Sequence, residues 1–161
     1  MGRVPADQRR MEFRSHMQAA LAEARAAGAR GEVPVGAVIV SPAGDIVAAA
    51  GNRTRELHDP TAHAEMLVIR AACAALGSER LSGHDLYVTL EPCPMCAAAI
   101  SFARIARLYY GAADPKSGGV AQGPRLFDQP QCHHAPEVYD GIAAVEAAAL
   151  LQDFFAARRA E

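Results

Sequence analysis

"DLYVTLEPCPMCAAAI", residues 85–100, places a strand pattern directly before a helix pattern. The β-branched and aromatic residues of 85–90 predict a buried strand. The two prolines that follow, Pro92 and Pro94, favour a helix start, because the first turn of a helix leaves its amide hydrogens unsatisfied and proline has none. We therefore expect a strand at 85–90 and a helix over Cys93–Ala103.

The same alternation of helix and strand extends to both sides of this stretch. The other expected elements are a helix around residues 13–24, a hairpin of strands at 33–41 and 46–52, a helix at 61–76, a strand at 107–111 and a C-terminal helix at 147–159. The helix at 61–76 begins with Thr61, which could cap it, and ends at Gly77. Residues 112–136 show no clear period and predict a loop, with only a short helical turn at 125–129. This pattern predicts an α/β fold, a sandwich with helices on both faces of a mixed sheet.

Composition limits the kind of protein. The chain has 161 residues, of which 51% are hydrophobic and 21% charged, values that are typical of one globular domain and exclude a disordered chain. The first ten residues are poor in apolar side chains, so we expect a flexible arm at 1–10 and a single domain at 11–161. The net charge of −2 supplies no general positive field, so contact with nucleic acid would need a local basic patch.

The sequence also suggests a compartment. The longest branched apolar run, residues 35–40, is too short to span a bilayer, and the chain does not open with the pattern of a signal peptide. Its four cysteines are then expected to be reduced, buried or metal-bound and not paired in disulfides. We therefore expect a soluble cytoplasmic protein with no membrane contact.

Two cysteines and a histidine suggest a metal site. Cys93 and Cys96 are three residues apart, which places both sulfurs on one face of the first helical turn. Free amides and the helix dipole favour thiolates there. A catalytic zinc ion takes three protein ligands of this kind and keeps one position for water. His63 is the candidate for the third ligand.

His63 and Glu65 also constrain the geometry of the site. Residues two apart on a helix point about 200° away from each other. Both can reach one point only if it lies beyond the start of their helix, so the metal is expected where the starts of two helices converge. Two thiolates already neutralise a zinc ion, which makes Glu65 more useful as a proton carrier than as a fourth ligand.

A simpler interpretation exists for each half of this pattern. A lone C-x-x-C is often a buried or structural pair, and a lone His-x-Glu is commonplace. Their occurrence in order, with proline before the first cysteine, matches the zinc-deaminase signature H-x-E then P-C-x-x-C. The remaining candidates, Cys73 and the "CHH" of residues 132–134, complete no standard zinc spacing.

Around these residues the chain resembles the cytidine deaminase-like superfamily, and more closely the bacterial tRNA-specific adenosine deaminases that act at the wobble position. The resemblance extends from Met11 to Arg159 and includes "DPTAHAE", residues 59–65, and "GAADPKSGG", residues 111–119. It implies a three-layer α/β/α sandwich with a central sheet of about five strands. It also implies one zinc ion per chain, held by His63, Cys93 and Cys96, with Glu65 as the proton shuttle.

The resemblance further implies a set of substrate contacts. They are Asn52, Val35, Ala37, Ala64, Pro92, Asp114, Lys116, His133, His134, Phe154 and Arg158. Relatives usually have Asn-His and a basic residue where this chain has His133, His134 and Ala135, a departure that bears on the bases flanking the target. Arg53, Arg55, Arg158 and Arg159 are the arginines that could bind phosphates.

The expected reaction is hydrolytic conversion of adenosine to inosine in a tRNA anticodon stem-loop, with an arginine tRNA of anticodon ACG as the substrate and a homodimer as the active assembly. One alternative is a deaminase of free guanine, cytosine or cytidine at the same zinc site. Another is a noncatalytic, zinc-stabilised RNA-binding module. The loop at 112–136 and the C-terminal helix separate the first two hypotheses, because they could grip RNA or close over a small molecule.

Overall fold

The structure is a computed structural model that describes residues 6–160, with side chains described from residue 16 onward. Its elements are, in order, helix α1 (Ala6–Ala29), strands β1 (Gly36–Val40) and β2 (Ile46–Gly51), helix α2 (Ala64–Leu76), strand β3 (Asp85–Leu90), helix α3 (Pro94–Phe102), strand β4 (Arg107–Ala112), the 3-10 turn η1 (Leu126–Asp128), strand β5 (Glu137–Tyr139) and helix α4 (Ala144–Arg159). Every strand and helix expected from the sequence is present among them.

The five strands form one mixed sheet in the order β2-β1-β3-β4-β5. β1 pairs antiparallel with β2 and with β3, whereas β4 pairs parallel with β3 and with β5. The two parallel pairs run through β3, β4 and β5, and the connection from β3 to β4 is helix α3. The expected mixed sheet is therefore confirmed.

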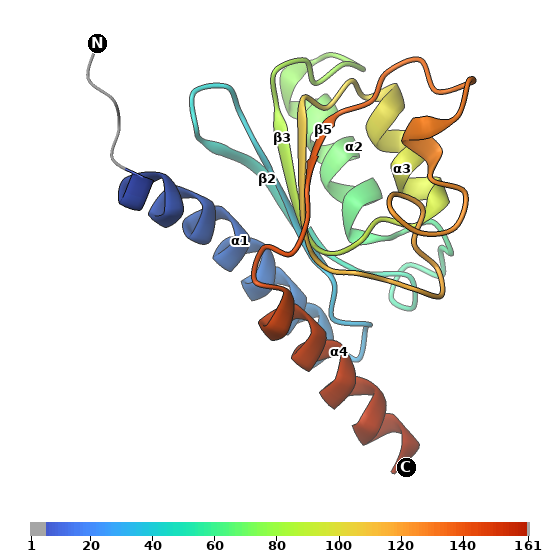
Figure 1. Ribbon diagram of the computed structural model, residues 1–161. Coiled ribbons are helices and arrows are strands. Elements are labelled where there is room, and N and C mark those ends of the chain that lie inside the picture. Colours follow the sequence, from blue (N-terminus) through green and yellow to red (C-terminus); the bar gives the residue numbers. More distant parts are fainter. Residues whose placement is uncertain (1–5, 161) are drawn as a thin grey trace.

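Helices cover both faces of this sheet (Figure 1). α1 and α4 pack on one face and contact each other, while α2 packs on the other face and contacts α3. Each interface has its own cluster of buried apolar side chains, so the sheet separates two hydrophobic layers. The predicted three-layer sandwich is confirmed. None of the helices formed by residues 6–160 is long and apolar enough to cross a membrane.

Helix α1 packs closely because its apolar residues share one face. The residues on that face that are fully buried include Met17, Ala20, Leu21 and Ala24. Gly36 at the start of β1 permits the close approach, since a Cβ there would lie 2.0 Å from the carbonyl oxygen of Ala20. The apolar residues of α1 therefore recur at helical spacing because this face of the helix lies directly on the sheet.

The start of α1 and the strand β5 differ from the sequence prediction. α1 begins at Ala6, so residues 6–10 of the expected arm are helical, whereas residues 1–5 lie outside the described residues. The division into an arm and one domain stays a prediction. Strand β5 was not predicted, because its three residues are all exposed and carry no apolar alternation. It forms through pairing with β4 and through stacking of Tyr139 on Tyr109, whose ring centroids are 4.9 Å apart.

Candidate active site

Three side chains converge as the sequence predicted. The Sγ atoms of Cys93 and Cys96 lie 3.7 and 3.5 Å from Nδ1 of His63, and the three ligand atoms are all within 4.8 Å of one another. Zinc bonds of about 2.3 Å to sulfur and about 2.0 Å to nitrogen, at tetrahedral angles, put such atoms roughly 3.5 Å apart. The residues therefore fit a zinc ion, and we call these three side chains the metal triad.

The metal triad lies at the starts of two helices, which confirms the expected convergence. His63 is the residue before α2 and Cys93 the residue before α3, and both have an extended backbone. Their carbonyls accept the first helical hydrogen bonds, from Leu67 and Ala97. Because the backbone turns at these positions, each side chain can point past the helix end and not along its side.

The start of α2 is stabilised differently from what the sequence suggested. Thr61 was expected to cap the helix, but its amide and hydroxyl both donate to Oδ1 of Asp59, at 2.8 and 2.7 Å. The helix begins three residues later, at Ala64. The amide of Ala64 donates to Oδ1 of Asn52 at 2.8 Å, so a residue from the end of the hairpin supplies the cap.

Hydrogen bonds within the metal triad shift the pKa values of the two thiols in opposite directions. Bonds from Cys96 and then from His63 lower the pKa of Cys93 to about 4, against the effect of burial. The bond with Cys93, and then burial, raise the pKa of Cys96. The bond with Cys93 also raises the pKa of His63. A metal ion takes cysteine as the thiolate and histidine as the neutral ring, so its binding at this site would release protons.

Glu65 lies beside the metal triad, in the first turn of α2. Its side chain is only 4% exposed. Burial raises the pKa of this carboxyl to about 7, since an ion is costly to keep away from water. Such a group can both accept and donate a proton near neutral pH.

A cavity of about 240 Å³ opens onto His63, Glu65 and Cys93. Three of the expected substrate contacts line it, namely Val35, Asn52 and Asp114. Ser117, from the "GAADPKSGG" stretch of the resemblance, lines it as well. It is also lined by residues that the sequence analysis missed: Val33, Thr54, Leu90 and Glu91. Apart from their position next to recognised motifs, these side chains carried no signal of their own, because the loops that bring them together are far apart in the sequence.

Three other expected contacts do not line this cavity. Ala37 and Ala64 are both fully buried, Ala37 within β1 and Ala64 at the start of α2. Pro92 is buried as well, and its carbonyl accepts a hydrogen bond from Gly119 at 2.8 Å. The structure therefore places these residues in the interior and not on the wall of the cavity.

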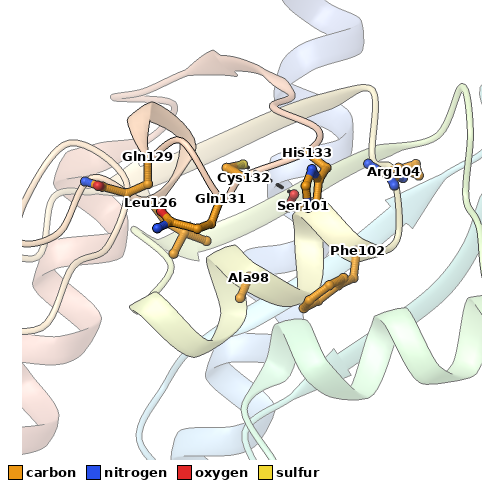
Figure 2. Close-up of a pocket in the computed structure, with 9 residues that line it drawn as sticks. All are labelled: Ala98, Ser101, Phe102, Arg104, Leu126, Gln129, Gln131, Cys132 and His133. Carbon is orange, nitrogen blue, oxygen red and sulfur yellow. Dashed lines mark hydrogen bonds between the residues drawn. The ribbon is translucent and has the colours of Figure 1, made fainter.

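The remaining loop contacts are spread more widely. Lys116 is exposed, and its amide donates to Oδ1 of Asp114 at 3.2 Å. His133 lies against a different, apolar cavity of about 280 Å³ between α3 and η1, next to Phe102 (Figure 2). The ring of His134 contacts the carbonyl of Ile105 at 2.7 Å, at the other end of α3 from Cys93. Within this chain, neither histidine lines the cavity of the metal triad.

Two buried glutamates also escaped the sequence analysis. Glu32 accepts hydrogen bonds from the amides of Arg55 and Glu56, at 3.0 and 3.3 Å. Glu91 accepts four backbone amides from residues 114–122. A carboxylate next to a buried segment is a weak signal in a sequence, because acidic residues in loops are usually solvated.

Exposed arginines gather beside the cavity. Nη1 of Arg55 and Nη2 of Arg158 both donate to the carbonyl of Gly31, at 3.1 and 2.7 Å. Nη2 of Arg30 donates to the carbonyl of Asn52 at 3.2 Å. We call Arg30, Arg55 and Arg158 the arginine cluster.

The arginine cluster connects the C-terminal helix to the cavity. The guanidinium of Arg158 also lies 4.6 Å from the ring centroid of Phe154, so the two expected contacts on α4 act as one unit. Arg53, by contrast, pairs with Glu56. The sequence had named Arg55 and Arg158 as possible phosphate ligands but gave no reason to include Arg30.

Comparisons with known proteins agree with this geometry. Residues 11–112 match the cytidine and deoxycytidylate deaminase zinc-binding region. A tRNA-specific adenosine deaminase of Agrobacterium fabrum is 65% identical over 150 residues, which are 92% of this chain and 98% of the relative.

Two solved structures are also similar. One, from biochemical and structural studies of A-to-I editing by tRNA:A34 deaminases at the wobble position of transfer RNA, has a TM-score of 0.84 and 66% identity, covering 85% of this chain and 99% of that one. The other, a guanine deaminase from Bacillus subtilis, has a TM-score of 0.62 and 32% identity, covering 90% and 92%. The similarity to the Agrobacterium fabrum relative and to the first of these structures extends over most of the chain, and the metal triad and the cavity agree with it. The chain is therefore an enzyme of the tRNA-specific adenosine deaminase family, with a zinc-binding deaminase fold.

Proposed function

We propose that this enzyme converts adenosine to inosine by hydrolysis at the first anticodon position of a tRNA, and that an arginine tRNA with anticodon ACG is the substrate. One observation carries the proposal: the buried carboxyl of Glu65 lies beside the metal triad on a cavity that is also lined by the side chain of Asn52. The family relationship to tRNA-specific adenosine deaminases supports the choice of substrate.

The proposed chemistry assigns one catalytic role to Glu65. A bound zinc ion would supply the Lewis acidity that makes water a nucleophile at neutral pH. Glu65 would accept a proton as the water oxygen forms its bond to C6 of adenine, and would pass that proton to the ring nitrogen. It would then carry the second proton of the water to the amine, so that the C6–N bond breaks and ammonia leaves with inosine as the product.

Asn52 is suited to hold the target nucleoside. Its Oδ1 is committed to the amide of Ala64, which fixes the orientation of the side-chain amide. The NH₂ group is then available to donate to an acceptor on the base or ribose. One residue would thereby link the start of α2, which positions His63 and Glu65, to the substrate.

The arginine cluster supports RNA over a free base as the substrate. Each of its three guanidiniums makes a hydrogen bond to a backbone carbonyl that leaves further N–H donors for other partners. The protein as a whole has a net charge of −2, so such a local group is what could attract phosphates. An anticodon loop also offers unpaired bases, which lowers the cost of moving one into a cavity.

A direct assay tests this proposal. The zinc-loaded protein is incubated with an anticodon stem-loop of sequence ACG, and inosine is quantified by nuclease digestion and mass spectrometry. The matched control is the same stem-loop with guanosine at the first anticodon position, which offers no C6 amine. Inosine at the first anticodon position only would support the proposal, whereas turnover of free adenosine with none in the stem-loop would contradict it.

A deaminase of free nucleobases or nucleosides is the second candidate, because the similar Bacillus subtilis structure is a guanine deaminase. The same preparation, given guanine, cytosine and cytidine in turn, would release ammonia under this alternative. The arginine cluster argues against it, since a neutral base has no phosphate for these side chains to bind.

We further propose that the enzyme acts in the cytoplasm as a homodimer, with one zinc ion per chain. The exposed apolar surface at Phe102, which is 76% exposed beside the cavity in Figure 2, supports an assembly of this kind. Light scattering coupled to gel filtration tests the dimer, and a monomeric mass at the assay concentration would contradict it. Elemental analysis of the same fraction tests the zinc stoichiometry.

A further inference from the structure

Glu91 is a buried carboxylate that lines the cavity but does not belong to the metal triad. It follows β3 directly and is only 2% exposed. Its Oε1 accepts the amide of Asp114 at 3.1 Å, and its Oε2 accepts the amides of Val120, Ala121 and Gln122 at 3.2, 3.0 and 3.1 Å. Its own amide donates to the carbonyl of Ala112 at 2.8 Å. Both ends of the segment 112–122 are therefore bound to one residue.

Three successive amides that point at one oxygen form a concave anion site in the backbone. Here the anion is a side chain of the same protein. Gly118 permits the enclosure, because a Cβ at this position would lie 2.5 Å from Oε2 of Glu91. The backbone of the loop thus closes over the carboxylate in a way that a larger residue would prevent.

The same loop packs against the metal triad. A Cβ at Gly119 would lie 2.5 Å from the nitrogen of Pro94 and 2.8 Å from the carbonyl carbon of Cys93. On the other side, Asp114 and Ser117 line the cavity. Oδ1 of Asp114 also accepts the amide of Ser117 at 3.0 Å, so the turn that carries both residues is ordered internally as well.

We propose that Glu91 is a positioning residue for the substrate: its carboxylate holds residues 114–122 as one side of the cavity, so that Asp114 and Ser117 face the bound nucleotide. Glu91 does not take part in the proton transfers, which belong to Glu65. The kinetic consequence rests on the proposed function, whereas the ordering of the loop does not depend on it.

The substitution Glu91→Gln tests this role with almost no change of volume. The side-chain amide of glutamine has one acceptor oxygen. Its NH₂ group must therefore face either the backbone N–H of Asp114 or the three backbone N–H groups at the Oε2 position, and two donors that face each other cannot form a hydrogen bond. We expect amide exchange at Val120, Ala121 and Gln122 to accelerate about ten-fold or more. We expect the KM for the stem-loop to rise about ten-fold, with kcat reduced less than about three-fold, because binding and not chemistry is affected.

Glu79→Gln is the matched control, since Glu79 is exposed in the connection after α2. Gly118→Ala disturbs the same contact from the side of the loop, because the added Cβ would collide with Oε2 of Glu91. It should raise the KM for the stem-loop in the same way. The double variant should be no worse than the more affected single variant, because each removes the same interaction. If Glu91→Gln does not fold, the Gly118→Ala variant provides the test of the positioning role. An unchanged KM for the stem-loop in that variant overturns the proposal.

The readouts also separate this proposal from the proposed function. A Glu91→Gln protein with normal exchange and normal KM overturns the positioning role. Loss of zinc with the loop still protected overturns it too, because Glu91 would then act through Cys93. If the unsubstituted protein makes no inosine in the stem-loop, the proposed function fails, but the exchange rates still decide whether Glu91 holds the loop.

Discussion

The candidate site combines two regions that are built in opposite ways. At one end, the metal triad and Glu65 are fixed by the starts of two helices, and Glu65 is buried. Beside it, the arginine cluster is exposed and is held by hydrogen bonds to backbone carbonyls and by the contact of Arg158 with the ring of Phe154. The first region has the geometry that bond breaking requires, while the second can adapt to a flexible polyanion. Substitutions should therefore divide into those that remove turnover and those that weaken binding.

The largest effect is expected from Cys96→Ala. Cys96 is fully buried and supplies one of the three ligand atoms, so two remaining ligands should not retain zinc. We expect the purified variant to contain no zinc by elemental analysis and to form no detectable inosine. Cys73→Ala is the control, since this half-buried cysteine lies in the middle of α2, and full zinc content is expected there.

Glu65→Gln should separate metal binding from proton transfer. The variant keeps the shape of the side chain and all of the metal triad but cannot carry a proton. We expect normal zinc content and a fall in kcat of about a thousand-fold. Single-turnover assays on the stem-loop measure this, and retention of more than a tenth of the activity would contradict the assignment.

Asn52 connects the two regions, and two substitutions divide its roles. Asn52→Ala removes both the cap on Ala64 and the donor to substrate, so we expect the free energy of unfolding to fall by about 1 kcal/mol. Asn52→Asp keeps an acceptor for the amide of Ala64 but loses the NH₂ group. In both variants kcat/KM should fall about ten- to hundred-fold.

Denaturant titration beside the kinetic assay provides the comparison for Asn52. The aspartate variant should be at least as stable as the alanine variant yet equally impaired in turnover. If the aspartate variant is fully active, then Asn52 only supports the helix and does not touch the substrate.

The smallest effect is expected from Arg158→Ala. Loss of the proposed phosphate contact should raise the KM for the stem-loop about three- to ten-fold and lower the salt dependence of binding by about one unit of slope, with kcat unchanged. Arg80→Ala, an exposed arginine in the turn after α2, should leave both quantities unchanged. Equal effects of the two substitutions would remove Arg158 from the RNA surface.

Most of the fold was predictable because its signals are local. The spacing of Met17, Leu21 and Ala24 marks the buried face of α1, and Gly77 ends α2 in the left-handed conformation that glycine favours. Strand β5 was not predictable, because it depends on pairing with β4 and not on its own composition. The start of α2 was misplaced for the same reason: its cap comes from Asn52, twelve positions earlier.

The sequence by itself identified the residues of the metal triad and Glu65, because the H-x-E and P-C-x-x-C patterns each place their side chains at a helix start by short-range geometry. The tertiary structure alone brings these two helix starts together and decides what surrounds them. The loop ordered by Glu91 and the arginine cluster on Gly31 and Asn52 depend on contacts between segments tens of residues apart. Such contacts exist only once the sheet and its helices have packed, and no periodicity in the sequence records them.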